Sequence, residues 1–205
     1  MVSTTLLETA IDQFGRHGFE GASTREIARA SGTAMSSITY HFGGKHGLYL
    51  AAADHIAAAI LAAQGPALEA ARAAADSAPE QATEALLALV DSLAQMMLSP
   101  ETEAWARFII REQQAPSEAF QRLYAGGMHA IADAAIALIA RIRPDIGDRD
   151  IRATCMLLFG QVLVLRAARA AVCRVMQVAT IDAETEALLR SRLRLHVRHI
   201  LSEKP

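Results

Sequence analysis

Apolar residues recur every three or four positions through each long segment of this chain, and no segment alternates apolar and polar residues for the length of a strand. Such a repeat gathers the apolar side chains on one face of an α-helix. Hydrophobic residues make up 52% of the chain, yet no run approaches the roughly 20 uninterrupted apolar positions of a membrane helix. We therefore expect an all-α protein that has a sizeable core and does not span a membrane.

Glycine, proline and capping residues divide this pattern into helices. The first apolar face is expected to end at Gly15–Gly18, and a capping box that begins at Ser23 predicts a second helix over residues 24–31. Gly32 separates it from a short third helix, and the sequence "GGK" leads into a long fourth helix that Gly65-Pro66 is expected to break. The third helix is predicted over residues 35–41. After the fourth, helices are predicted over residues 80–98, 101–114, 117–142, 149–176 and 183–202.

Residues 24–38 have the spacing of two short helices that cross closely. Ala28 supplies the small side chain that such a crossing requires, and Gly32 allows the positive φ of a sharp turn. Ile27 and Ile38 are placed to close a small core from both sides. This is the sequence form of a helix-turn-helix, whose second helix enters the major groove of DNA.

The third predicted helix and its flanks carry hydroxyl, aromatic and cationic side chains that suit DNA. Hydroxyl groups bond base edges or phosphates, and a methionine can touch a thymine methyl. Lys45 opens the fourth helix, where its charge and the free N–H groups would clamp a phosphate, and Arg25 can reach a guanine edge. The candidate DNA-binding residues are Thr24, Arg25, Met35, Ser36, Ser37, Thr39, Tyr40, His41 and Lys45.

These residues resemble the TetR family of bacterial repressors, whose DNA-binding module is three helices followed by an aromatic "YHF" and a lysine. The resemblance covers about residues 5–55. The family usually has a valine and then a Ser or Asn cap after the turn glycine, whereas this chain has Thr33 and Ala34, which makes Thr33 a candidate cap of the third helix. The stretch "FIIREQQAPSEAF", Phe108–Phe120, resembles the CecR-like subgroup of the same family.

The resemblance implies a ligand-responsive transcriptional regulator, by family habit a repressor. It would bind a palindromic operator in double-stranded DNA as a homodimer, and a small, largely apolar effector would release it. A helix-turn-helix DNA-binding domain is expected over residues 1–46, and a helical effector-binding and dimerisation domain over residues 47–205. The N-terminal sequence lacks the features of an export signal, so we expect a cytoplasmic protein.

The resemblance also implies that the last two predicted helices pair with those of a second copy in a four-helix bundle. Small residues would allow close approach, and an apolar stripe on the last helix would fill the contact. The alternative reading of this stripe is an ordinary core within one chain. The candidate interface residues are Gly160, Ala167, Ala171, Leu189, Leu193, His196 and Ile200.

Members of the family enclose an effector pocket, for which aromatic and methionine residues are the candidates. Plain core packing is the alternative for each, although Trp105, Tyr124 and His129 carry polar tips within apolar stretches. Arg111 beside Glu112 would suit an anionic group, and an exposed charged face explains the pair equally well. The candidate lining residues are Met96, Met97, Trp105, Phe108, Arg111, Phe120, Tyr124, Met128, His129 and Phe159.

The net charge of −2 argues against strong non-specific attraction to DNA. Cations and carboxylates are equal in number over the first 50 residues, so we expect a modest salt dependence of binding. The alternatives are an enzyme and a helical adaptor that binds protein partners. The chain has no nucleophile elbow, Rossmann glycines or phosphate-binding loop, which disfavours an enzyme.

Histidines and cysteines provide no metal site. His196 and His199 are three apart on a predicted helix but lack a third ligand, so we expect no metal and no cofactor. Cys155 and Cys173 are predicted to lie in one helix about 27 Å apart. That separation rules out a disulfide between them.

Overall fold

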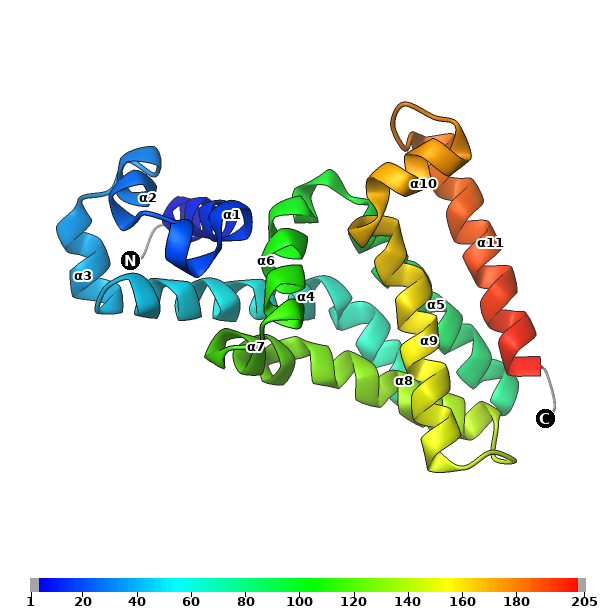
Figure 1. Cartoon of the computed structure of the whole chain (residues 1–205). Helices are drawn as coiled ribbons and strands as arrows, with labels where there is room; N and C mark the ends of the chain where they lie inside the picture. The colour runs from blue at the N-terminus through cyan, green and yellow to red at the C-terminus, as the bar shows by residue number, and fades with distance from the viewer. Residues whose placement is uncertain (1–3, 203–205) are drawn as a thin grey trace. The chain divides into compact units, whose positions relative to one another are not determined.

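The computed structural model describes residues 4–202, which form helices joined by short turns and contain no strand (Figure 1). This confirms the predicted all-α fold. The elements are α1 Thr4–Gly21, α2 Thr24–Ala30, α3 Met35–Phe42, α4 Lys45–Ala74, α5 Pro79–Leu98, the 3₁₀ turn η1 Pro100–Thr102, α6 Glu103–Gln114, α7 Glu118–Leu123, the π-turn η2 Tyr124–Met128, α8 His129–Ile142, α9 Asp148–Ala167, α10 Arg169–Met176 and α11 Ala183–Ser202.

Three predicted helix limits were wrong. α4 continues through Pro66 to Ala74, because the alanine-rich residues on both sides favour helix strongly enough to offset one missing hydrogen bond. α1 passes Gly15 and bends at Gly18, whose φ of 72° and ψ of 176° are not helical, before a last turn to Gly21. The segment predicted as one helix over residues 149–176 is two helices, α9 and α10, with an angle of 83° between them.

The chain divides into two compact units. The N-terminal unit contains residues 4–62 and Glu101–His129, and the C-terminal unit contains Ala63–Pro100 and residues 130–202. α6 and α7 therefore belong to the same compact unit as the three N-terminal helices.

The core of the N-terminal unit is aromatic and aliphatic. Phe14, Ile27 and Ile38 are fully buried, so α1, α2 and α3 close on one another as the spacing predicted. Tyr49 of α4 lies edge-on to Phe14 at 4.8 Å between ring centroids, and Phe108 of α6 lies 4.7 Å from Tyr49. These contacts join α4 and α6 to the three-helix core.

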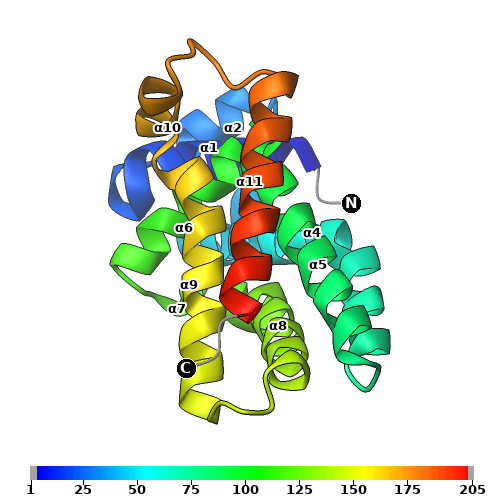
Figure 2. The same cartoon turned by 90° about the vertical axis from the view of Figure 1, so that its right-hand side faces the viewer.

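In the C-terminal unit α5 packs against α9 and α11, and α9 and α11 lie side by side (Figure 2). Leu193, Val197 and Leu201 of α11 are buried in this core. Leu193, predicted to lie on the dimer surface, is therefore packed within one chain, whereas Leu189, His196 and Ile200 of the same predicted stripe are half-buried or exposed. Cys155 and Cys173 are free thiols on two different helices rather than on one.

Two helical stretches, Lys45–Ala74 and Glu118–Ile142, are long and apolar enough by length and composition to cross a membrane. Their hydropathy comes largely from alanine, and polar contacts tie them together in the N-terminal unit. Arg122 forms an ion pair with Asp54 at 2.7 Å, and Gly127 lies against the Ala57 carbonyl. Small apolar residues here serve close helix packing.

Candidate nucleic-acid interface

The turn between α2 and α3 is fixed by local hydrogen bonds. The Ser23 hydroxyl caps α2 by accepting from the Glu26 N–H at 3.5 Å. Gly32 adopts a φ of 66°, and the Thr33 N–H donates to the Ala28 carbonyl at 2.9 Å. Because a side chain at positive φ is strained, glycine is suited to this turn. The geometry is that of the predicted helix-turn-helix.

α3 has one buried and one open face. Ile38 is fully buried, while Ser36, Thr39 and His41 are exposed and Tyr40 is 85% exposed. Met35 is also exposed, and Ser37 is half-buried. α3 thus presents hydroxyl, aromatic and thioether groups outward from a fixed base, as a groove-reading helix requires.

The start of α3 differs from the expectation for Thr33. Ala34, not Thr33, is the N-cap residue, and no side chain caps the helix. Thr33 instead uses its backbone N–H to close the preceding turn. The free N–H groups at the start of α3 thus have no side-chain cap.

Lys45 and the residues of α2 were also predicted to reach DNA. The Lys45 ammonium donates to the Glu20 carbonyl at 3.0 Å and lies 4.8 Å from the centre of the Phe19 ring. It therefore closes the end of α1 in this structure. Arg25 is exposed and Thr24 half-buried at the first turn of α2.

Comparison with known families decides the identity of this fold. The family model for bacterial regulatory proteins of the tetR family matches residues 6–52, which contain the helix-turn-helix. The model for the C-terminal domain of the HTH-type transcriptional dual regulator CecR matches residues 82–203, more than half of the chain. The chain belongs to the TetR family of bacterial regulatory proteins. Within it, the C-terminal part is CecR-like, as the sequence predicted.

Relatives of this TetR-family regulator are themselves regulators of transcription. The chain is 30% identical over 200 residues to the dual regulator CecR of Shigella flexneri, covering 96% of this chain and 89% of CecR. A transcriptional regulator from Rhodococcus sp. Rha1 has the same fold, with a TM-score of 0.67, 20% identity and full coverage of both chains. FadR from Bacillus subtilis, solved with stearoyl-CoA, has a TM-score of 0.62, 14% identity and coverage of 94% and 96%.

The candidate effector residues are divided between the two units. Met96, Met97 and Phe159 belong to the C-terminal unit and the other candidates to the N-terminal unit. Met96 is buried, and its sulfur lies 3.9 Å from the Gln64 amide nitrogen. In the N-terminal unit Trp105 and Met128 are half-buried, and the rings of Phe120, Tyr124 and His129 follow one another at 6.2 and 6.3 Å.

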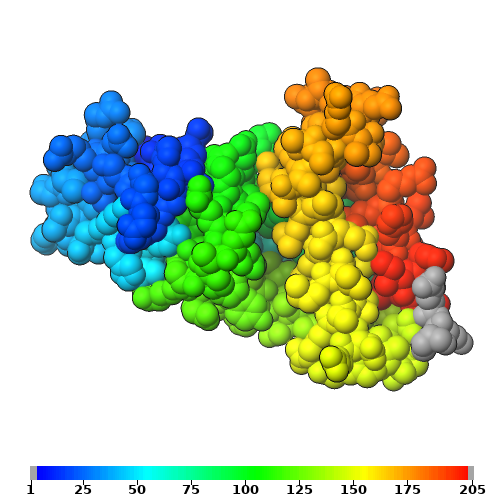
Figure 3. Space-filling view, in the orientation of Figure 1, coloured from blue at the N-terminus to red at the C-terminus, as the bar shows by residue number. Residues whose placement is uncertain are grey.

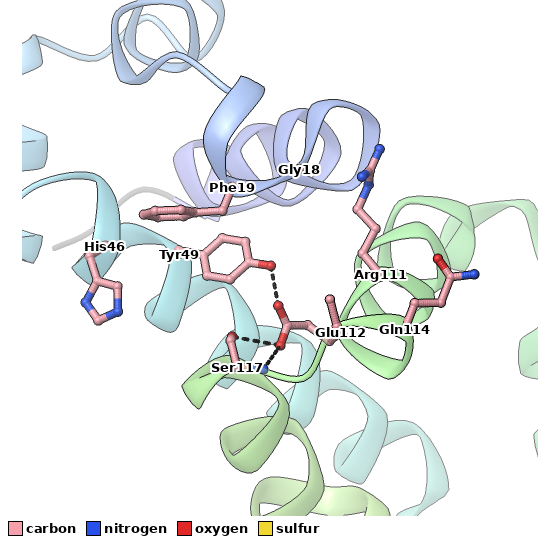
Figure 4. A pocket seen from close by; sticks show the side chains of 9 residues that line it. Gly18, Phe19, His46, Tyr49, Arg111, Glu112, Gln114 and Ser117 are labelled. Atoms are coloured by element: carbon pink, nitrogen blue, oxygen red, sulfur yellow. Dashed lines mark hydrogen bonds between the residues drawn. The ribbon is translucent and has the colours of Figure 1, made fainter.

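Arg111 and Glu112 both form hydrogen bonds within the N-terminal unit. Arg111 binds two backbone carbonyls of α1, and Glu112 is 3% exposed and binds Tyr49 and Ser117 (Figure 4). Buried Glu112 is therefore not part of a solvated charged face, whereas Arg111 is exposed, and anion binding by Arg111 stays a prediction. A cavity of about 460 Å³ opens beside this pair, lined by Gly18, Phe19, His46, Tyr49, Arg111, Glu112, Gln114, Ala115 and Ser117.

Sequence reasoning missed Tyr49 and Ser117 as partners of Glu112. One signal was available: Ser117 after Pro116 starts a helix, and a carboxylate five residues earlier can accept from its N–H. No local signal points to Tyr49, which is 63 residues from Glu112.

The predicted dimer residues lie partly on an open face of the C-terminal unit. Gly160, Ala167, Ala171 and His196 are exposed, and Leu189 and Ile200 are half-buried. The largest apolar side chains on this face were not predicted. They are Met156, Leu157, Leu163 and Val164 of α9, and Leu188 and Leu195 of α11.

Proposed function

We propose that this TetR-family protein is a ligand-responsive repressor that binds a palindromic operator as a homodimer and is released by a small-molecule effector. Residues 1–46 would form the DNA-binding domain and residues 47–205 the effector-binding and dimerisation domain, acting in the cytoplasm. The outward face of α3 carries the proposal: Ser36, Thr39 and Tyr40 are exposed on a helix whose base, Ile38, is fully buried. A helix held in this way can enter the major groove without rearranging the core.

The homodimer is supported by the open face of α9, which lies at the surface of the C-terminal unit (Figure 3, yellow). Met156 is 64% exposed, Leu157 70%, Leu163 48% and Val164 47%. Residues three, four, seven or eight positions apart share one face of a helix, so these four side chains form one continuous stripe on α9. The exposed Gly160 lies at the centre of this stripe. An apolar stripe of this kind marks a protein contact, and a twofold contact would bring it onto itself.

A small-molecule effector is supported by an incompletely bonded amide in the C-terminal unit. Gln64 is 1% exposed, and its Oε1 has no hydrogen-bond partner within residues 4–202. A buried acceptor left in this state is costly unless a donor reaches it. The adjacent Met96 sulfur is soft and apolar. The pair would suit a largely apolar effector that carries one hydrogen-bond donor. The stearoyl-CoA in FadR from Bacillus subtilis indicates that the fold can hold such a molecule.

Selection of binding sites from random DNA tests the operator. The wild-type protein should enrich an inverted repeat whose half-sites are about one DNA turn apart. Tyr40→Ala should then weaken binding to that operator roughly tenfold, since each protomer loses one predicted DNA contact. Val175→Ala, which removes an exposed side chain of the C-terminal unit, is the control. Recovery of no palindrome, or a footprint unchanged by Tyr40→Ala, would favour the helical adaptor instead.

The salt dependence of operator binding gives a second check. Arg16 is already paired with Asp12 at 2.8 Å, and Lys45 is bonded to the end of α1. The slope of log affinity against log salt should therefore correspond to clearly fewer than the ~10 counterions expected of a strongly basic dimer. A slope that steep would contradict this count of available cations.

A further inference from the structure

The cavity of about 460 Å³ in the N-terminal unit is not part of the DNA-reading face of α3. Four segments line it: the end of α1, the start of α4, the end of α6 and the turn that leads into α7 (Figure 4). Gly18, where α1 bends, and Ala115, where α6 ends, have little or no side chain to fill the space. All four segments belong to one compact unit, and the volume is that of a small-molecule site.

One side of the cavity is aromatic. Phe19 of α1 and Tyr49 of α4 lie 5.1 Å apart between ring centroids, and the His46 ring lies 6.1 Å from that of Phe19. Tyr49 is held by ring contacts with Phe14 and Phe108, whereas Phe19 is only half-buried. Rings that are fixed in this way offer edges and faces to the ring of a ligand. This side of the cavity therefore favours a planar aromatic group.

The carboxylate of Glu112 lies between the two sides of the cavity but is already bonded (Figure 4). Its Oε1 accepts from the Tyr49 hydroxyl at 2.5 Å, and its Oε2 accepts from the N–H and hydroxyl of Ser117 at 3.1 and 2.8 Å. Three of its roughly four acceptor positions are thus filled from within the protein, which disfavours a cationic ligand. Arg111, which lines the cavity, and Lys45, which lies against Phe19, carry positive charges that offset that of Glu112.

Arg111, on the other side of the cavity, has donors left to give. Its Nε donates to the Gly15 carbonyl at 2.8 Å and its Nη2 to the Arg16 carbonyl at 2.7 Å. A guanidinium has five N–H bonds, so three remain, and none of these has a partner within residues 4–202. A Cβ on Gly18 would lie 3.2 Å from Nη1, so the glycine leaves this nitrogen uncovered.

A guanidinium anchored in this way is suited to a carboxylate. The two carbonyls of α1 are neutral acceptors that fix the position of Arg111 without pairing its charge. One free N–H on each Nη can then donate to the two oxygens of a carboxylate as a fork. The exposed Gln114 lies at the rim on the same helix. The cavity thus combines a fixed aromatic side with an unpaired guanidinium.

We propose that this cavity binds a small aromatic carboxylate, whose ring contacts Phe19 and Tyr49 and whose carboxylate binds Arg111. The site goes beyond the proposed function. It lies in the N-terminal unit, whereas Gln64 and Met96, which support the effector, belong to the C-terminal unit. It is a second ligand site that requires neither DNA nor a dimer.

Calorimetric titration of the whole chain without DNA tests the site. The probes are cinnamate and its uncharged isostere cinnamamide, which have nearly the same shape. Arg111→Gln removes the guanidinium, and Arg72→Gln, the matched control, removes the same charge from an exposed position of the C-terminal unit. Gln114→Glu places a carboxylate at the exposed rim and leaves the bonds of Arg111 to α1 in place. Circular dichroism should show the same helix content in each variant; should Arg111→Gln lose helix, Gln114→Glu decides alone.

Wild type and Arg72→Gln should bind cinnamate roughly tenfold or more tightly than cinnamamide, because only the carboxylate forms charge-assisted hydrogen bonds. In Arg111→Gln this preference should fall to about twofold or less. In Gln114→Glu cinnamate should bind about threefold or more weakly than in wild type, while cinnamamide binding is unchanged. Phe19→Leu should weaken both probes alike, since it removes the ring that both contact.

A wild-type protein that binds neither probe, or binds both equally well, would overturn the proposal. So would a preference for cinnamate that survives both Arg111→Gln and Gln114→Glu, because the carboxylate would then be bound elsewhere. Failure of the wild-type protein to select any DNA would remove the proposed repressor function. It would leave this result unaffected, since the titration contains no DNA.

Discussion

The Tyr49 hydroxyl donates a 2.5 Å hydrogen bond to Oε1 of Glu112, although the two residues are 63 positions apart in the chain. The bond joins the start of α4 to the end of α6, inside the compact unit that contains the helix-turn-helix. Tyr49 is buried between Phe14, Phe19 and Phe108, so its hydroxyl has little freedom to choose another partner. This pair therefore shows how α6 is held to the DNA-reading part of the molecule.

Replacing Tyr49 by Phe should destabilise the protein by about 1–3 kcal/mol at neutral pH, because the buried carboxylate of Glu112 loses one partner. Urea denaturation at pH 7 measures this difference. Tyr124→Phe, at an exposed ring, is the control and should lie within about 0.5 kcal/mol of wild type.

The same variant should change the response to alkaline pH. Burial, together with the hydrogen bond to Glu112, raises the pKa of Tyr49 above its ordinary value. The folded state then keeps its proton where the unfolded state releases it, so the contribution of Tyr49 is full below about pH 10 and is lost above it. The stability gap between wild type and Tyr49→Phe should shrink when measured above about pH 10. A constant gap would show that Tyr49 titrates alike in both states.

An ion pair in the C-terminal unit should govern part of the acid response. The hydrogen bond from Arg190 holds the pKa of Asp91 below its usual range. Because the pKa of Asp91 is lower in the folded state, the ion pair stabilises the protein above the pKa of the unfolded chain, about 3.9. This stabilisation is lost as the pH falls below about 3.9. Asp91→Asn should therefore be less stable than wild type at pH 7, with the gap closing as the pH falls below about 3.9. In an Arg190→Gln background, Asp91→Asn should no longer change the acid response.

Close packing of η2 on α4 predicts a steric cost. A Cβ on Gly126 would lie 2.7 Å from the Ala57 Cβ, so Gly126→Ala should cost about 1–3 kcal/mol in thermal or chemical unfolding. Gly21→Ala, where the new Cβ meets only the His17 Cβ at 3.4 Å, should be close to neutral. In the double variant Ala57→Gly with Gly126→Ala, the cost should be smaller than the sum of the single costs. Additive costs would mean that the two residues do not touch.

The exposed stripe of α9 predicts the effect of a charge on self-association. Leu157→Glu should weaken dimerisation by roughly a hundredfold, because a twofold contact places the new carboxylate on both sides. Light scattering over a concentration series measures the change, and circular dichroism should show an unchanged helix content. Ala88→Glu, on an exposed position of α5, is the matched control. A Leu157→Glu protein that still dimerises as tightly as wild type would place the interface elsewhere.

Several features were determined by the sequence alone. The spacing of apolar residues by three and four positions specified an all-α fold. The positions of Ile27, Gly32 and Ile38 specified the helix-turn-helix, because these residues act on neighbours only a few positions away. Local signals of this kind can be read from one stretch of chain. The local signal was misleading at Pro66, which predicted a break in the helix. α4 continues through Pro66, because the helix propensity of the flanking alanines outweighs the effect of one proline.

Only the tertiary structure decided which side chains meet over long separations. In the sequence the adjacent charges of Arg111 and Glu112 read equally as an anion site or a solvated face. Only folding placed Arg111 against the carbonyls of α1 and Glu112 against the hydroxyl of Tyr49. In the same way, folding buried Leu193 within one chain and left Leu157 open on α9. A helical repeat fixes which residues share a face, but the arrangement of all the helices decides whether that face is covered.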